Sequence, residues 1–94
     1  MAYSQVPTLA ADATFLVQSK AAMVAQALAY ASTFTVNDAP TSLAVAILRD
    51  LTTYTSLFAY EVASQLVTNG FPTSPTDAQV LAATQTVFFA MARR

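Results

Sequence analysis

The amino-acid sequence predicts an all-α protein, a three- or four-helix antiparallel bundle built around one long central helix. Two observations support this prediction. Apolar residues recur at steps of three and four over most of the chain, which is the spacing of one face of an α-helix. No stretch of comparable length shows the apolar–polar alternation that is typical of strands. The 94 residues are expected to form a single helical domain.

The central helix is expected between Thr41 and Asn69, where one helical face collects a series of apolar residues. The series is Leu43, Ile47, Leu51, Tyr54, Phe58, Val62 and Leu66. The segment 52–56 is rich in Thr and Ser, which are poor helix formers, so the helix should either bend there or break in two. The continuous apolar series favours one bent helix. Gly70 is expected to form the C-terminal cap, because glycine tolerates a left-handed conformation.

Two further helices should flank the central one. The first is expected to begin near Thr8 or Asp12 and to run to about Phe34. Its many alanines leave much of its surface small, which permits the close approach of another helix. The last is expected to begin with Ser74 as its N-cap and Asp77 in its first turn, and to run to the end of the chain.

The composition excludes several classes of function. The chain has no His, no Cys and one Gly, so it lacks the residues of an imidazole or thiolate site and of a glycine-rich phosphate loop. The acidic residues are better explained as helix caps, or lie too far apart to act as an acid–base pair. We therefore expect no enzyme activity, no cofactor, no metal and no small-molecule substrate. With only four basic residues, dispersed along the chain, nucleic-acid binding is not expected either.

The low charge predicts a surface that other protein covers. Only 10% of the residues are charged and 55% are hydrophobic, whereas ordinary soluble domains have about 25% charged residues. A surface of Ser, Thr, Gln and Ala is inexpensive to remove from water, because few charges have to be desolvated. The chain is therefore interpreted as a subunit of an oligomeric assembly. An Ala-rich monomer with a neutral surface is an alternative.

A membrane interpretation is a further alternative. The windows 21–37 and 78–92 are free of charge, as in a small membrane protein of the holin type. A spanning helix needs about 20 strongly apolar residues. Both windows are shorter and contain Gln, Ser or Thr, so soluble amphipathic helices fit them better. The N-terminal residues also lack the features of a signal peptide, so the chain is expected to remain where it is made.

Five apolar residues are candidates for the interface with other subunits: Tyr3, Val6, Phe71, Phe88 and Phe89. Residues 1–8 are predicted to form an extended arm, because Pro7 keeps the residue before it out of the α region. Phe88 and Phe89 are adjacent and point about 100° apart on a helix, so a single neighbouring helix cannot bury both. A third alternative is a helical adaptor domain that binds a partner helix, which would require an exposed hydrophobic groove.

The order of features along the chain carries a resemblance to a known class of proteins. An aromatic follows an acid early in the first helix, as Asp12 and Phe15. Arg49 precedes an Ala-rich apolar helix, and a polar turn leads to a last helix that opens with Asp77 and closes on the series VFFA. In these features the chain resembles the short all-helical virion structural proteins of tailed bacteriophages. It departs from them at Phe88, where a tryptophan would be expected.

The resemblance implies a function and a location. It implies a virion component, such as a capsid decoration or cement protein, a neck protein or a tail protein, without choosing among them. It also implies assembly in the host cytoplasm, with other virion proteins and copies of the same chain as partners.

Overall fold

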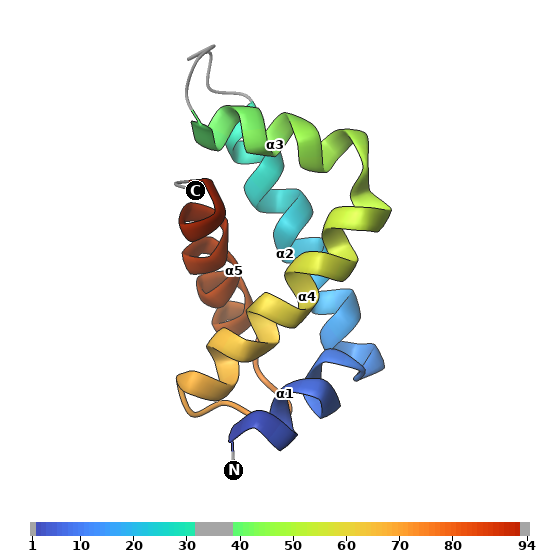
Figure 1. The fold of residues 1–94 in the computed structure, drawn as a ribbon, viewed down its shortest axis with the longest axis vertical. Coiled ribbons are helices and arrows are strands. Elements are labelled where there is room, and N and C mark those ends of the chain that lie inside the picture. The colour runs from blue at the N-terminus through green and yellow to red at the C-terminus, as the bar shows by residue number, and fades with distance from the viewer. Residues whose placement is uncertain (1, 32–38, 93–94) are drawn as a thin grey trace.

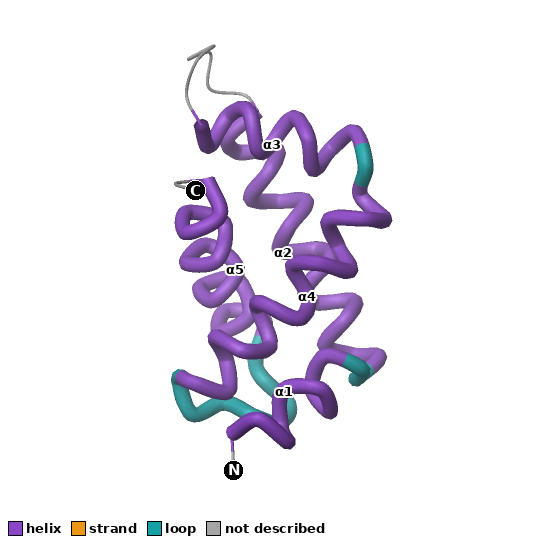
Figure 2. Tube along the Cα trace, viewed as in Figure 1, coloured by secondary structure: helices purple, strands orange, loops and turns teal. Residues whose placement is uncertain are grey.

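The computed structural model describes residues 2–31 and 39–92, except for the side chains of residues 2–4, 39 and 41. These residues form five helices: α1 (Ala2–Ala10), α2 (Ala13–Ala31), α3 (Ala39–Arg49), α4 (Leu51–Thr68) and α5 (Asp77–Ala92) (Figure 1). The described part of the chain contains no strand (Figure 2), so the prediction of an all-α fold is confirmed.

α2 and α4 each contact all of the other helices. In Figure 1, α3 and α4 cross in front of α2, and α5 lies beside it. α1 covers the opposite end of the molecule from α3 and packs mainly against α4. The molecule is elongated, with extents of 42 × 22 × 21 Å. α2 is therefore covered by α3, α4 and α5, and the side that faces away from them is left for solvent or a partner.

The predicted central helix is two helices, α3 and α4, which meet at Asp50. Asp50 has φ −141° and ψ 69°, outside the helical region. Its carboxylate Oδ1 accepts a hydrogen bond from the backbone N–H of Thr53 at 3.3 Å, which satisfies one of the free N–H groups at the start of α4. The expectation of one bent helix is therefore wrong. The break precedes the Thr-rich segment 52–56, which is helical.

Residues 2–10 form α1, so the expectation of an extended arm over residues 1–8 is also wrong. Val6 and Leu9 are 6% and 3% exposed, and α1 packs on α4. Burying two aliphatic side chains contributes about 3–6 kcal/mol, which matches or exceeds the cost of about 3 kcal/mol for a proline inside a helix. The burial of these two residues explains why Pro7 is tolerated within α1.

Two of the expected helix boundaries are confirmed. The Asp12 carboxylate accepts a hydrogen bond from the N–H of Phe15 at 2.9 Å, and α2 begins at the residue after Asp12. α4 ends in a Schellman motif, in which Gly70 has φ 89° and the N–H of Phe71 donates to the carbonyl of Leu66 at 2.9 Å. The side-chain and backbone signals around both ends were therefore interpreted correctly.

α5 begins later than expected. Its N-cap is Thr76 rather than Ser74, because the Thr76 hydroxyl accepts from the N–H of Gln79 at 3.2 Å. The Gln79 side-chain oxygen in turn accepts from the N–H of Thr76 at 2.9 Å. This reciprocal pair is a capping box. Ser74 has φ 45° and belongs to the turn that precedes the helix.

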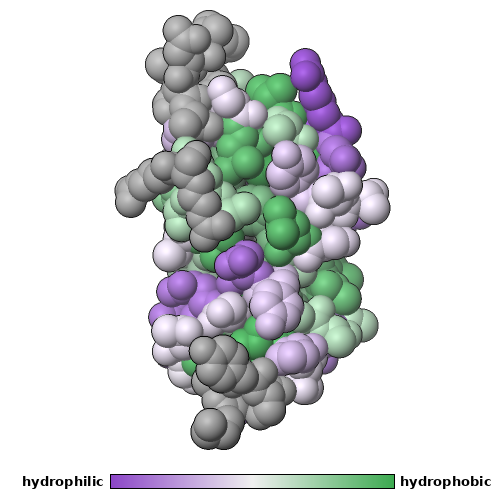
Figure 3. Space-filling model, viewed as in Figure 1, coloured by the Kyte–Doolittle hydropathy of each residue, from purple (hydrophilic) through white to green (hydrophobic). Residues whose placement is uncertain are grey.

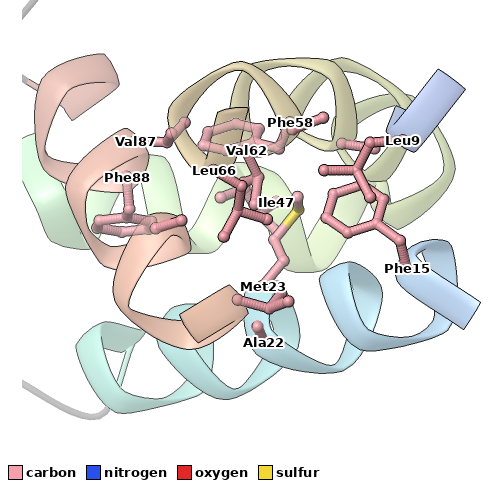
Figure 4. Close-up of a cluster of buried hydrophobic side chains, with 14 of the residues drawn as sticks. Leu9, Phe15, Ala22, Met23, Ile47, Phe58, Val62, Leu66, Val87 and Phe88 are labelled. Carbon is pink, nitrogen blue, oxygen red and sulfur yellow. The ribbon is translucent and has the colours of Figure 1, made fainter. Parts of the chain in front are cut away.

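The core lies where the five helices meet (Figure 4). Its largest fully buried apolar side chains are Phe15, Met23, Ile47, Phe58, Val62, Leu66, Val80 and Phe88. An aromatic group also joins the C-terminal halves of α2 and α5, since Tyr30 stacks on Phe88 with ring centroids 5.2 Å apart. Phe89 meets Tyr30 edge-on at 5.4 Å. Such ring pairs each contribute about 0.5–1.5 kcal/mol beyond the area that they bury.

Candidate interaction surface

The candidate site is an apolar surface on the outer side of α2. Val17 and Leu28 are 71% and 55% exposed, the highest values for large apolar side chains in the described part of the chain. Ala21 and Ala25 are also exposed, and Val24 is half-buried. These five residues, Val17, Ala21, Val24, Ala25 and Leu28, are called the α2 stripe.

The α2 stripe lies on the opposite side of the helix from the residues that α2 buries. At about 100° per residue, the direction of the stripe is roughly reversed at Ser19, Met23 and Gln26. Ser19 and Gln26 are polar, but they are only 0% and 6% exposed. α2 therefore buries two polar side chains among its apolar ones and exposes two large apolar side chains, so it is less clearly amphipathic than an ordinary surface helix.

The stripe lines a shallow trough that continues toward α5. Two adjoining depressions of about 670 and about 320 Å³ share Val17, Ala21 and Ala25 among their lining residues. The short side chains of Ala21 and Ala25 line both depressions. Leu28 lines the larger one, and Leu81 of α5, which is 38% exposed, lines the smaller one. The trough is open to solvent among the described residues, so a partner would meet it without first displacing any of them.

Hydrogen bonds hold α2 and α5 together beside the trough. The Gln18 side-chain nitrogen donates to the Asp77 carboxylate at 2.8 Å and to the carbonyl of Pro75 at 3.0 Å. Further along the same two helices, the stacked rings of Tyr30 and Phe88 form a second attachment. The surface is thus fixed at two places along its length, and a preformed surface loses less conformational freedom on binding.

Charged groups are sparse around the α2 stripe. Lys20 is the one charged residue in the sequence of α2, and Asp77 is the one charged residue in the sequence of α5. Lys20 borders the trough, and its side chain is exposed. Covering this side of the molecule would therefore remove few charges from water, which keeps the desolvation cost low.

The face formed by α3 and α4 differs from the α2 stripe in how its apolar side chains are distributed (Figure 3). Apolar side chains gather there over part of α3, and elsewhere they lie among pale and purple polar residues. On α4, Leu57 and Tyr60 are 46% and 52% exposed. Their neighbours Ser56 and Glu61 are polar. Single exposed apolar residues of this kind are common on protein surfaces and do not by themselves indicate an interface.

The five interface residues predicted from the sequence do not form one surface. Val6 and Phe88 are 6% and 0% exposed, so both belong to the core and have almost no surface to offer a partner. Phe89 is half-buried and lies edge-on to Phe88, with ring centroids 6.0 Å apart. Phe71 is 38% exposed beyond the end of α4. The side chain of Tyr3 lies outside the described residues.

The sequence contains a signal for the α2 stripe that the prediction missed. Val17, Ala21, Val24 and Leu28 are separated by four, three and four residues, as on one face of a helix. The series is hard to recognise because α2 carries a second apolar series on its inner side, which includes Phe15 and Met23. In a helix that is apolar on two sides, periodicity alone does not tell which side faces the core.

Other kinds of site find no support among the described residues. Within residues 2–31 and 39–92, no group of three or more His, Cys, Asp or Glu side chains could hold a metal ion. No helix in that part of the chain has the length and hydropathy needed to span a membrane. In comparisons with known proteins, no family model, no curated protein and no solved structure gives a significant match to the chain.

Proposed function

We propose that the protein is a non-enzymatic structural subunit of an oligomeric assembly. The observation that supports this most strongly is the α2 stripe, a helix face with Val17 71% exposed and Leu28 55% exposed while the same helix buries polar residues. α2 carries apolar residues on two sides. In the monomer α3, α4 and α5 cover one of them, and the proposed assembly supplies a cover for the other.

The size of the stripe favours an assembly over a single strong complex. Full burial of Val17 and Leu28 would contribute about 1–2 kcal/mol each, because most of each side chain is still exposed. Association costs at least about 4 kcal/mol in lost freedom of motion. One such contact is therefore weak, and it becomes strong when symmetry repeats it or when other contacts in the same particle support it.

The assembly that we propose is a bacteriophage virion, with the chain as a capsid decoration, neck or tail protein. This part of the proposal is supported by the resemblance in sequence pattern, including the closing series VFFA. In the fold, this series provides Phe88 to the core and Phe89 to the contact with Tyr30. It therefore stabilises the subunit itself, and the contact surface is assigned to α2.

A helical adaptor domain that binds an amphipathic partner helix is the second candidate. The observation that favours it is the open trough along Val17, Ala21 and Ala25, which Leu81 extends toward α5. An apolar helix face binds in grooves of this kind through residues at helical spacing. An adaptor differs from a structural subunit in one measurable property, because it remains a monomer without its partner.

Light scattering on a concentration series of the full chain tests the proposal. We expect an average mass above that of the 9.9 kDa monomer, rising with concentration, because each contact is weak. Circular dichroism on the same samples should be dominated by helix. A monomer mass at every concentration would contradict the structural-subunit proposal and leave the adaptor.

Mass spectrometry of fractions from the native source tests the virion part separately. The chain is expected in purified particles, in a constant ratio to the other particle proteins. Recovery only in particle-free fractions would contradict a virion location, whatever the state of association.

A further inference from the structure

We infer that α1 exchanges between two copies of the chain, so that α1 of each copy packs on α4 of the other. In this exchanged form the turn between α1 and α2 straightens, and the two helices become one. The partner is a second copy, because the surface of α4 that receives α1 is already fitted to α1 in the closed form, in which α1 packs on α4 of its own chain. The inference goes beyond the proposed function, since this contact does not involve the α2 stripe.

α1 is a separable element of the fold. It has nine residues and contains Pro7, which lacks a backbone N–H and crowds the preceding helical turn. A helix of this length is not stable in water without tertiary contacts. α1 obtains those contacts mainly from α4, with Val6 and Leu9 buried in the core. When α1 leaves α4 of its own chain, the same surface on a second copy can cover both side chains.

The sequence of the turn is compatible with a continuous helix. Only Ala11 and Asp12 lie between α1 and α2. No Gly or Pro occurs over residues 8–31, and alanine, the strongest helix former, occupies positions 10, 11 and 13. Short-range bonds hold the closed turn, in which the N–H of Asp12 donates to the carbonyl of Leu9 at 3.0 Å and the Asp12 carboxylate caps α2. A change in these two residues alone is therefore enough to join the helices.

Straightening the turn would give helical partners to backbone groups that the closed turn leaves without them. α2 begins at Ala13, so the N–H groups of Ala13 and Thr14 precede its first helical hydrogen bonds. In a continuous helix they would donate to the carbonyls of Leu9 and Ala10, four residues earlier. Exchange would thus add helical bonds and keep the contacts of α1 with α4. Exchange of an identical element through a short hinge is a low-cost route to a dimer for this reason.

The exchanged form depends on protein concentration and on time. In one chain the short turn keeps α1 beside α4 at an effective concentration of about 1 mM or more, so the closed monomer dominates in dilute solution. Exchange begins only after α1 has left α4, so the exchanged dimer forms slowly and persists on dilution. Contacts through the α2 stripe require no opening and are lost on dilution. The two kinds of association can therefore be measured separately.

Two substitutions in the turn should act in opposite directions. Ala13→Pro suits the closed form, because proline is favoured at the first position of a helix, where its missing N–H is not needed. In a continuous helix the same proline would clash with the carbonyl of Leu9. Asp12→Ala removes the cap of α2 and places a strong helix former in the turn. Both positions are exposed, so neither change alters the core.

Each chain is incubated well above about 1 mM, the effective concentration of the tethered α1, in urea below the main unfolding transition. It is then returned to buffer, diluted and separated at once by size-exclusion chromatography. We expect a dimer of the unmodified chain that persists after dilution. Its yield should be several-fold higher for Asp12→Ala and several-fold lower for Ala13→Pro, with the monomers of all chains equally helical by circular dichroism.

Hydrogen exchange of the isolated dimer, measured by NMR, reports the turn directly. The amides of Ala13 and Thr14 should be protected in the dimer and unprotected in the monomer, because only the continuous helix supplies their partners. Leu28→Glu is the matched control. It changes the α2 stripe and leaves the turn intact, so its dimer yield should equal that of the unmodified chain.

Each other outcome overturns the inference in a recognisable way. Equal dimer yields for Asp12→Ala and Ala13→Pro, or unprotected amides at positions 13 and 14 in the dimer, would mean that the turn stays closed and the copies meet elsewhere. Loss of the dimer in Leu28→Glu would assign it to the α2 stripe, and the proposed function would stand. Monomer alone in every sample would also overturn the exchange, whereas the proposed function is decided by light scattering without urea.

Discussion

The inner and outer sides of α2 both carry apolar residues, whereas an ordinary surface helix is apolar on its inner side only. The inner side places Ser19 and Gln26 beside Met23 in the interior, whereas the outer side exposes Val17 and Leu28. Removal of apolar surface from water is the main force that favours folding, and the outer side of α2 contributes little of it. The comparison shows that stability of the monomer does not account for the apolar residues of the stripe. The association that we propose would account for them.

The largest expected difference between the two sides concerns the stability of the monomer. Met23 is fully buried, so Met23→Ala should lower the free energy of unfolding by about 2–5 kcal/mol through lost contacts and a cavity. Leu28→Ala removes a side chain that is 55% exposed and should change the free energy of unfolding by less than about 0.5 kcal/mol. Urea denaturation of dilute protein, followed by circular dichroism, measures both.

Dilute protein is needed because association would add its own stabilisation to the value for the unmodified chain. Equal losses for the two variants would remove the distinction between the sides and would place Leu28 in a packed interior.

A smaller effect is expected at Ser19 on the inner side. Its hydroxyl oxygen is buried and has no hydrogen-bond partner among the described residues. A buried polar atom without a partner costs about 1–3 kcal/mol. Ser19→Ala should therefore raise the free energy of unfolding by about 1 kcal/mol, seen as a higher urea midpoint with an unchanged slope. A fall in the midpoint would show that the hydroxyl is paired after all.

Signals between residues that are close in sequence were sufficient to predict two helix ends. Asp12 as the cap of α2 and Gly70 as the end of α4 are confirmed, because each acts on backbone groups within a few residues. The break at Asp50 was missed, because Ile47 and Leu51 continue one apolar series across it. Both helices turn that series toward the same core, so the pattern continues although the helix does not.

The burial of individual apolar residues depended on tertiary contacts that the sequence does not specify. From the sequence, either Phe88 or Phe89 could have faced the core. In the structure Tyr30 of α2 stacks on Phe88 and meets Phe89 edge-on. Val6 was expected to be uncovered, because α4 lies far from it in sequence. The α2 stripe was missed for a related reason, since both sides of the helix carry apolar series and the packing of α3, α4 and α5 decides which side is buried.

The most direct measurement of the central claim is light scattering on Leu28→Glu beside its matched control, Leu57→Glu. The two leucines are 55% and 46% exposed, so neither change should unfold the monomer, and circular dichroism checks this. A glutamate at position 28 would put a charge into the proposed contact, where burial without a partner is costly. We expect Leu28→Glu to remain monomeric at concentrations where Leu57→Glu associates like the unmodified chain. Association of Leu28→Glu to the same extent as its control would contradict the account.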